Sequence, residues 1–309
     1  MKHLKKFDSV SDMESAIETA AVDFIGLAYD TQGGTAKVRI VKEVPPPDPK
    51  TIPFYIDNIS DSENTVTITR KTYAPILTIE KSLDNKTWET MGTTSSTPIT
   101  ATIPPKGRLY LRCYTDTWCG RASNKILCNN HYNIGGNIMS LLFGSYFTGK
   151  QIIIRKTNAF SNLFEYQNKL VDASNLLLPA TTLKSSCYSN MFKGCTSLTT
   201  APALPATTLV DNCYNSMFRD CTSLTTAPEL PATTLTDWCY CYMFSGCTNL
   251  NYIKCLATDI SASQCTGNWV QGVASTGTFV KNPSMSKWGT VGVMYSDVPS
   301  GWTIQDAPK

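Results

Sequence analysis

The sequence has little charge and no long apolar run, and each shortage excludes a class of function. Charged residues make up 17% of its 309 residues, and the formal net charge is only +3. A nucleic-acid-binding domain needs a strongly basic surface, and the only basic cluster, MKHLKKF at the start, is followed at once by acidic residues. No segment reaches the roughly 18 apolar residues that a membrane span requires. The composition therefore predicts neither nucleic-acid binding nor membrane insertion.

Residues that catalysis needs are also scarce. The chain contains only two histidines, His3 and His131, and neither lies near the repeated cysteines described below, so no activated Cys–His pair is suggested. Neither a phosphate-binding loop nor a glycine-rich dinucleotide fingerprint is present. A hydrolase needs two facing carboxylates, but the segment 184–250 holds only Asp211, Asp220, Glu229 and Asp237. We therefore predict a protein that is not an enzyme and uses no cofactor.

A secretory signal is missing as well. After Lys6 the sequence DSVSDMESAIETA places Asp and Glu where an uninterrupted apolar segment would be needed. We therefore expect that the chain either stays in the cytosol where it is made or reaches the exterior by another route. The release of assembled virus particles by lysis is one such route.

What the sequence does contain is a repeat of 26 residues. Its copies, CYSNMFKGCTSLTTAPALPATTLVDN, CYNSMFRDCTSLTTAPELPATTLTDW and CYCYMFSGCTNL, begin at Cys187, Cys213 and Cys239. A degenerate copy starts at Phe160, so the repeats are placed at residues 160–256. A fixed period in this range is typical of stacked coils, which present a surface more often than they catalyse a reaction.

Comparing the copies predicts the structure of one coil. The shared Cys, Tyr, Met, Phe and Cys residues have the spacing i, i+1, i+4, i+5, i+8, which is typical of one face of an α-helix. A short extended segment between two leucines predicts a strand, and LPATT predicts a turn, so that stacking closes a shared core. The residues predicted to form this repeat core are Cys187, Met191, Phe192, Cys195, Leu198, Leu204, Leu209, Cys213, Met217, Phe218, Cys221, Leu224, Leu230, Leu235, Cys239, Met243, Phe244, Cys247 and Leu250.

The chain has twelve cysteines, and seven of them lie between Cys187 and Cys247, in the three clear copies of the repeat. Six of these seven recur at fixed positions of the unit, which favours buried packing residues. Disulfides are the alternative, since the compartment is not defined by the sequence.

The motifs MF-x-GC-T-SL and LPATTL and the leucine spacing resemble BspA-like leucine-rich repeats, which occur in surface proteins of gut and oral bacteria and of their phages. The segments Gly135–Gly144 and Gly277–Ile304 resemble the flanking pieces of such proteins, so the resemblance covers about residues 51–304. The unit here is longer than is usual in that family, and MF replaces its common AF. The opening MKHLKKFDSVSDMESAIE resembles those of phage structural proteins.

The predicted fold class is α+β and multidomain: a β-sandwich followed by a short leucine-rich-repeat solenoid of strand-turn-helix coils with a C-terminal cap. The capping box Ser11–Glu14 predicts a helix through Ala20, ahead of strands at Val22–Tyr29 and Lys37–Lys42. The cap is anchored by Trp269, Trp288 and Trp302. The predicted domains are an attachment unit (1–44), a Pro-rich linker (45–50), the sandwich (51–127), a junction (128–159), the repeats (160–256) and the cap (257–309).

Further elements are predicted within the sandwich and the junction. Gly135-Gly136 predicts a turn, and Ile152–Arg155 predicts a strand. Strands of the sandwich are expected at Asn64–Arg70, Pro75–Lys81, Thr87–Met91, Thr97–Ile103 and Arg108–Tyr114.

Two other groups of residues suggest chemistry only weakly. Cys113, Cys119, Cys128 and His131 contain the donors of a Cys3His zinc site, but only Cys128 and His131 have a usual ligand spacing. Core thiols, or one Cys113–Cys119 disulfide, are favoured over zinc. The segment Ser82–Trp88 resembles the Asp-box turn of sialidases, but it is one residue short and lacks the glycine. A hairpin turn with the tryptophan in the core is the favoured interpretation.

Residues that differ between the copies are predicted to face outward and to bind a ligand. Exposed aromatic side chains beside polar groups suit sugars or protein loops, although packing of the two aromatic residues against the cap is an alternative. Tyr240 is an alternative to Tyr242. The predicted binding residues are Arg219, Glu229, Asp237, Trp238 and Tyr242.

The functional hypothesis is a non-enzymatic structural or adhesion protein of a bacteriophage particle, as a tail fibre, head fibre, spike or capsid-decorating protein. It would be made in the host cytoplasm and located on the virion surface. Residues 1–44 would bind other virion proteins, and the repeats would bind a host-surface glycan or protein. The partners include further copies of the chain, for example in a trimer. A BspA-like adhesin on a bacterial cell surface is the alternative.

Overall fold

The computed structural model describes residues 24–30, 37–42, 47–118, 124–286, 288 and 298–308. The chain divides into two compact units, Met1–Asp48 and Pro49–Lys309. In the first unit, β1 (Phe24–Asp30) pairs antiparallel with β2 (Lys37–Lys42), which confirms the two strands predicted there. The helix predicted from the capping box lies outside the described residues.

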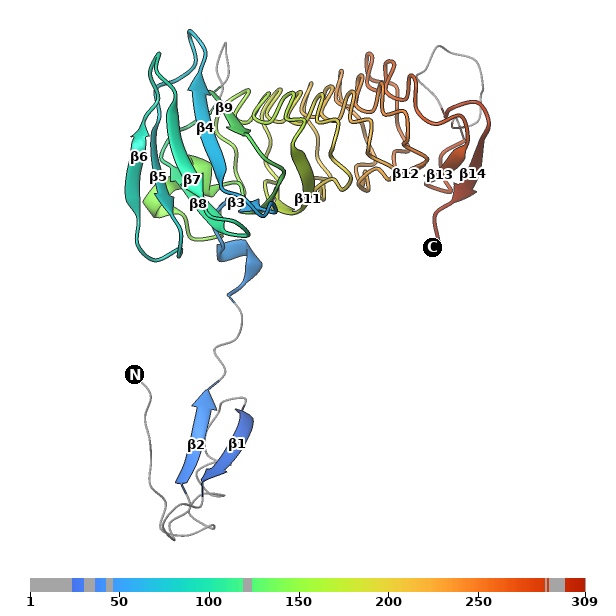
Figure 1. Cartoon of the computed structure of the whole chain (residues 1–309). Coiled ribbons are helices and arrows are strands. Elements are labelled where there is room, and N and C mark those ends of the chain that lie inside the picture. Colours follow the sequence, from blue (N-terminus) through green and yellow to red (C-terminus); the bar gives the residue numbers. More distant parts are fainter. Residues whose placement is uncertain are drawn as a thin grey trace. The chain divides into compact units, whose positions relative to one another are not determined.

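The second unit begins with two β-sheets (Figure 1). A short 3-10 turn, η1 (Pro49–Thr51), precedes them. The three-stranded sheet has the order β7 (Ile99–Ile103), β4 (Asn64–Arg70) and β9 (Asn124–Cys128). The six-stranded sheet has the order β11 (Leu170–Leu177), β10 (Tyr132–Asn137), β3 (Tyr55–Asn58), β8 (Arg108–Cys113), β5 (Thr78–Ser82) and β6 (Glu89–Thr93).

Alternation of buried and less buried residues explains how the sheets share a core. In β4, Val66 and Ile68 are fully buried, and in β8, Leu109 and Leu111 are buried at every second position. Successive side chains of a strand point to opposite faces, so each sheet turns one apolar face inward. The five strands predicted between residues 64 and 114 are confirmed as β4, β5, β6, β7 and β8. The buried residues of both sheets belong to one core.

The turn predicted at Gly135-Gly136 is wrong, because both glycines lie inside β10. A Cβ on Gly135 would collide with the ring of Tyr55, and one on Gly136, which has φ +74°, would collide with the carbonyl of Pro53. Glycine is therefore needed here for the close approach of β10 to β3. The strand predicted at Ile152–Arg155 is also wrong, since only Ile153 forms an isolated bridge, to Thr182.

The predicted fold class is wrong: the chain is mostly β rather than α+β, and its repeats are not strand-turn-helix coils. Among the described residues the only α-helix is α2 (Ser140–Phe143), which precedes the repeats and is followed by the 3-10 turn η2 (Gly144–Tyr146). Each segment of the repeats that was predicted to be a helix is instead a run of turns. The leucine-rich-repeat solenoid is thus replaced by a stack of turn-built coils.

The backbone of these turns repeats every four residues. Ser186, Asn190 and Gly194 have positive φ values of 58°, 55° and 72°. Between them, alternate N–H groups bond within the coil, as from Met191 to the carbonyl of Tyr188 at 3.2 Å. The other N–H groups bond to the next coil, as from Phe192 to the carbonyl of Met217 at 2.9 Å. An α-helix would use every N–H within its own segment, whereas here half of them join neighbouring coils.

Aromatic ladders fill the interior of the stack. The rings of Phe192 and Phe218 lie 5.5 Å apart and nearly parallel, and those of Tyr188 and Tyr214 lie 5.8 Å apart. Offset ring pairs of this kind contribute about 0.5–1.5 kcal/mol each beyond the burial of their area. All residues predicted to form the repeat core are buried, none of them more than 4% exposed.

The coil geometry continues through the segment that was expected to be a cap. The N–H of Phe244 donates to the carbonyl of Trp269 at 2.8 Å, as in the preceding coils. Trp269, Trp288 and Trp302 are all buried. Three parallel strands follow the same stacking direction (Figure 1), namely β12 (Tyr252–Cys255), β13 (Gly277–Lys281) and β14 (Trp302–Asp306).

Candidate functional site

Two of the predicted binding residues, Trp238 and Tyr242, lie at coil corners with positive φ, and a third, Arg219, precedes such a corner. Trp238 has φ 59° and is 41% exposed, and Tyr242 has φ 54° and is half-buried. The equivalent corners of other coils are occupied by Asn212 and by Asn190 and Ser216, which are small and polar. A left-handed backbone costs roughly 1–2 kcal/mol for a residue with a Cβ, and Asn tolerates it better than a bulky residue does. The backbone therefore gives no reason for aromatic residues at these corners.

Arg219 joins Tyr242 in one exposed cluster. Its guanidinium carbon lies 5.2 Å from the centroid of the Tyr242 ring, in cation–π geometry. Its Nε lies 3.6 Å from a carboxylate oxygen of Asp220, too far for a hydrogen bond, and has no hydrogen-bond partner among the described residues. Sequence comparison missed Asp220, although the same corner is a glycine in the coils before and after it. We name Arg219, Asp220 and Tyr242, together with Trp238 at the preceding left-handed corner of the Tyr242 coil, the corner cluster; the described contacts join the first three residues, and Trp238 is included for its position on the same coil.

The other two predicted binding residues do not belong to this cluster. The carboxylate of Asp237 accepts a hydrogen bond from the N–H of Ser263 at 2.8 Å, so it ties two coils together. Glu229 pairs with Lys254 at 2.9 Å, and no contact described for this part of the chain links it to the corner cluster. The alternative Tyr240 is only 1% exposed and belongs to the aromatic ladder. Glu229 and Asp237 thus have partners outside the corner cluster, and their role in binding stays a prediction.

Tyr166 is a further exposed aromatic residue that the sequence analysis missed. It has φ 62° and is 57% exposed, and a Cβ on Gly194 of the next coil would meet its ring. The Nζ atoms of Lys125 and Lys193 lie 5.6 and 5.4 Å from its ring centroid. Both lysines also contact Glu165, at 2.7 and 3.7 Å. An overlay of the degenerate first copy on the second would have paired Tyr166 with Gly194 and exposed this difference.

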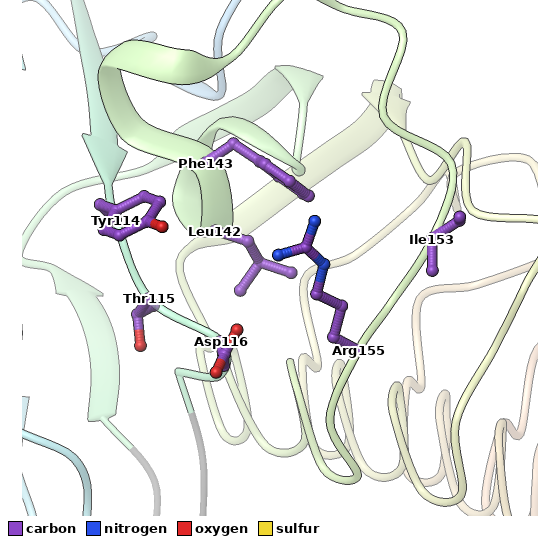
Figure 2. Close-up of a pocket in the computed structure, with 7 residues that line it drawn as sticks. All are labelled: Tyr114, Thr115, Asp116, Leu142, Phe143, Ile153 and Arg155. Carbon is purple, nitrogen blue, oxygen red and sulfur yellow. The ribbon is translucent and has the colours of Figure 1, made fainter.

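A separate pocket of about 250 Å³ lies between the end of β8, α2 and the segment after η2 (Figure 2). Figure 2 shows the carboxylate of Asp116 and the guanidinium of Arg155 on different sides of Leu142, with Phe143 above the guanidinium. We name it the Arg155 pocket. Its lining residues are Tyr114, Thr115, Asp116, Leu142, Phe143, Ile153 and Arg155.

The geometry does not favour a zinc site. Cys113 lies in β8 and Cys128 in β9, which belong to different sheets. Burial raises the pKa of Cys113 to about 12 and also raises that of Cys128. No group of three or more metal-binding side chains is found in the described ranges, which do not include Cys119.

The segment that resembles an Asp-box forms the hairpin turn between β5 and β6, as expected. The carboxylate of Asp84 accepts hydrogen bonds from the N–H groups of Thr87 and Lys86, both at 2.8 Å, and these hold its pKa well below its usual range. Trp88, however, is not in the core. It is half-buried under the guanidinium of Arg112, which lies 4.1 Å from the ring centroid.

Comparison with known proteins assigns no family to this architecture. No protein-family model, curated protein or solved structure matches the chain. In the part of the chain that the structure describes, none of the helices is long and apolar enough to cross a membrane.

Proposed function

We propose that the chain is a non-enzymatic protein of a bacteriophage particle, such as a fibre, spike or decorating protein, and that its coils recognise the host surface. The observation that carries this proposal is the corner cluster. Trp238, which is 41% exposed, and Tyr242, which is half-buried, stand at left-handed corners where other coils have polar residues. Strained backbone that persists is typical of functional sites.

The stack that carries the cluster supports the proposal because it is preorganised. Neighbouring coils are joined by backbone hydrogen bonds at alternate residues and by stacked rings. A ligand that binds such a surface does not have to order it first, which preserves affinity. An exposed aromatic ring, Trp238, and the partly exposed pair of Tyr242 and Arg219 suit a glycan or a protein loop.

The context of a phage particle is supported by sequence resemblance and by the division of the chain. Residues 1–18 resemble openings of phage structural proteins, and the repeats resemble BspA-like proteins of gut bacteria and their phages. The first unit, Met1–Asp48, is compact in its own right, which suits a separate attachment module. We assign it the role of binding other proteins of the particle.

The test is to locate the chain in particles released by the cells that carry its gene. Immunogold labelling and mass spectrometry of purified particles are expected to find the full chain at a constant copy number. A variant that lacks residues 1–48 should be absent from the particles while remaining in the lysate. Normal incorporation of that variant would overturn the attachment role, and a chain found only in the bacterial envelope would favour the cell-surface adhesin instead.

A matched variant tests recognition separately from incorporation. The triple change Arg219→Ala, Trp238→Ala and Tyr242→Ala should leave the copy number per particle unchanged, because all three side chains are at least partly exposed. Adsorption of these particles to host cells should fall by about tenfold or more, as expected when a binding hot spot is truncated. Glu229→Ala is the control, since this residue lies outside the corner cluster. Equal adsorption of all three particle types would show that the cluster does not bind the host.

A further inference from the structure

The Arg155 pocket contains two opposite charges that the described chain does not pair. Both Asp116 and Arg155 are exposed at the pocket, and neither has a hydrogen-bond or ion-pair partner within the described residues. A purely apolar ligand would cover both charges without satisfying them, which is costly. The pocket therefore suits a ligand that brings an anionic group to one side and hydrogen-bond donors to the other.

The placement of Arg155 selects a planar anion. Its guanidinium carbon lies 5.5 Å from the centroid of the Phe143 ring, and Figure 2 shows the group pointing toward this ring. A guanidinium that rests on an aromatic ring still has N–H donors free at its edge, and these match the two oxygens of a carboxylate. On the other side of the pocket, the Asp116 carboxylate can only accept hydrogen bonds at neutral pH, so it requires hydroxyl or amide donors.

Tyr114 adds a flat and fixed wall. Its side chain is 71% exposed and contacts the ring of Tyr146, with the centroids 5.4 Å apart. The backbone behind it is held close to α2, because Thr115 donates to the carbonyl of Leu142 at 3.0 Å. Gly144, with φ +53°, allows this approach, since its Cβ would lie 3.1 Å from that of Tyr114. An exposed aromatic face next to hydrogen-bonding groups suits the C–H face of a sugar ring.

The volume of the pocket matches a ligand portion of about one ring. A volume of about 250 Å³ is just below the roughly 300–1,000 Å³ of sites for drug-sized ligands. We propose that the Arg155 pocket binds an acidic monosaccharide residue, meaning a sugar ring that carries a carboxylate beside its hydroxyl groups. The carboxylate pairs with Arg155, the hydroxyls donate to Asp116, and the ring packs on Tyr114. This site lies outside the coils, and the proposal does not depend on where the chain is located.

The test is a titration of the purified full chain with two matched sugars, methyl glucuronide and methyl glucoside, followed by calorimetry or ligand-observed NMR. The acidic sugar is expected to bind with a Kd on the order of 1 mM, as a small polar ligand with few contacts should. The neutral sugar should bind about tenfold more weakly or worse, because it leaves Arg155 without a partner. Equal binding of the two sugars would overturn the proposal, as would failure of both the glucuronide and a methyl glycoside of N-acetylneuraminic acid to bind at ~20 mM.

Variants distinguish binding in the Arg155 pocket from a general attraction of anions by the positive charge of the chain. Arg155→Met should lower the affinity for methyl glucuronide about tenfold or more and leave that for methyl glucoside unchanged. Tyr114→Ala should weaken both sugars. Lys156→Met is the control: it removes the same charge from the neighbouring exposed position, which does not line the pocket, and should change neither affinity. An equal loss in Lys156→Met and Arg155→Met would mean that only the net charge attracts the sugar, which would overturn the assignment.

Discussion

In successive coils, Cys195, Cys221 and Cys247 each donate an Sγ–H hydrogen bond to a phenylalanine carbonyl of the preceding coil, at 3.0, 3.1 and 3.0 Å. The expectation of buried packing thiols rather than disulfides agrees with this geometry, since all cysteines in the described residues are free. Burial raises the pKa of Cys195 and Cys247 to about 12 each. These thiols are therefore neutral and shielded under ordinary conditions.

The raised thiol pKa values predict how stability depends on pH. Below the ordinary thiol pKa of 9.0, both the folded and the unfolded chain hold the proton, so the contribution is constant. Above it, the unfolded chain releases protons that the folded chain keeps until about pH 12, so the free energy of unfolding falls. The slope approaches about 1.4 kcal/mol per pH unit for each such thiol well above pH 9, so the total loss between about pH 8 and about pH 10 is about 1.4 kcal/mol per thiol.

Urea unfolding in the presence of a reductant, at about pH 8 and about pH 10, measures this loss. Cys195→Ala is the control and should reduce the loss by the share of one thiol, because it removes one titrating group. Buried Tyr188 and Tyr214, whose pKa values burial also raises, add to the fall at the upper end. An unfolding free energy that stays level over this range would contradict the prediction.

At the scale of the element, each coil corner is defined by its left-handed residue and by what covers it. Gly194 and Gly272 occupy the third corner of their coils with the same φ of +72°. The Cβ position of Gly194 faces the ring of Tyr166, whereas that of Gly272 has only backbone atoms of Gly246 near it, at 3.8 Å or more. The two glycines therefore separate the effect of backbone conformation from that of crowding.

Gly272→Ala should lower the free energy of unfolding by about 1–2 kcal/mol, which is the cost of a left-handed residue with a Cβ. Gly194→Ala should lower it by about 1 kcal/mol more, because the exposed Tyr166 ring must also move away from the two lysines beside it. In the double variant Tyr166→Ser/Gly194→Ala this excess should disappear, as a double-mutant cycle by urea unfolding will show. Equal losses for the two single variants, with no coupling, would mean that the ring does not rest on Gly194.

The sequence predicts the coil period and core well, but not the local conformation. Comparing copies identifies Met191 and Phe192 as core because stacking places equivalent residues on top of one another. The spacing i, i+1, i+4, i+5, i+8 spans only nine residues, over which a four-residue turn and a helix of 3.6 residues per turn bury the same positions. The sequence feature that distinguishes the two conformations is an Asn, Ser, Asp or Gly at every fourth residue, as at Ser186, Asn190 and Gly194. These residues favour a left-handed backbone over a helix.

The candidate sites were predicted only in part, for a different reason. Trp238, Tyr242 and Arg219 could be found because they break the repeat locally. The Arg155 pocket could not, because it joins segments around residues 114, 142 and 155 that no sequence pattern connects.

At the scale of the second unit, the stack begins on the sheets and grows by one coil at a time. Strand β11 pairs in parallel with β10, and the rings of Phe54 and Phe164 lie 5.9 Å apart, so the sheets cover the first coil. Each later coil contacts mainly the coil before it and the coil after it. The stability of such an array is close to a sum of coil terms and neighbour terms, and residues 26 apart are structurally equivalent.

This equivalence predicts that one whole coil can be removed. Deletion of residues 213–238 joins Asn212 to Cys239, so that Tyr188 meets Tyr240 and Phe192 meets Phe244 in place of the deleted rings. We expect a folded chain with cooperative unfolding and an unchanged far-UV circular dichroism spectrum per residue, because each remaining coil still packs against an equivalent coil.

Deletion of half a coil, residues 213–225, is the control. It should prevent folding, since it stacks residues that are not equivalent in the repeat. Because the full deletion also removes Arg219, Asp220 and Trp238, it should abolish binding by the corner cluster while sparing the Arg155 pocket; aggregation of both deletion variants alike would show that the coils are not interchangeable units.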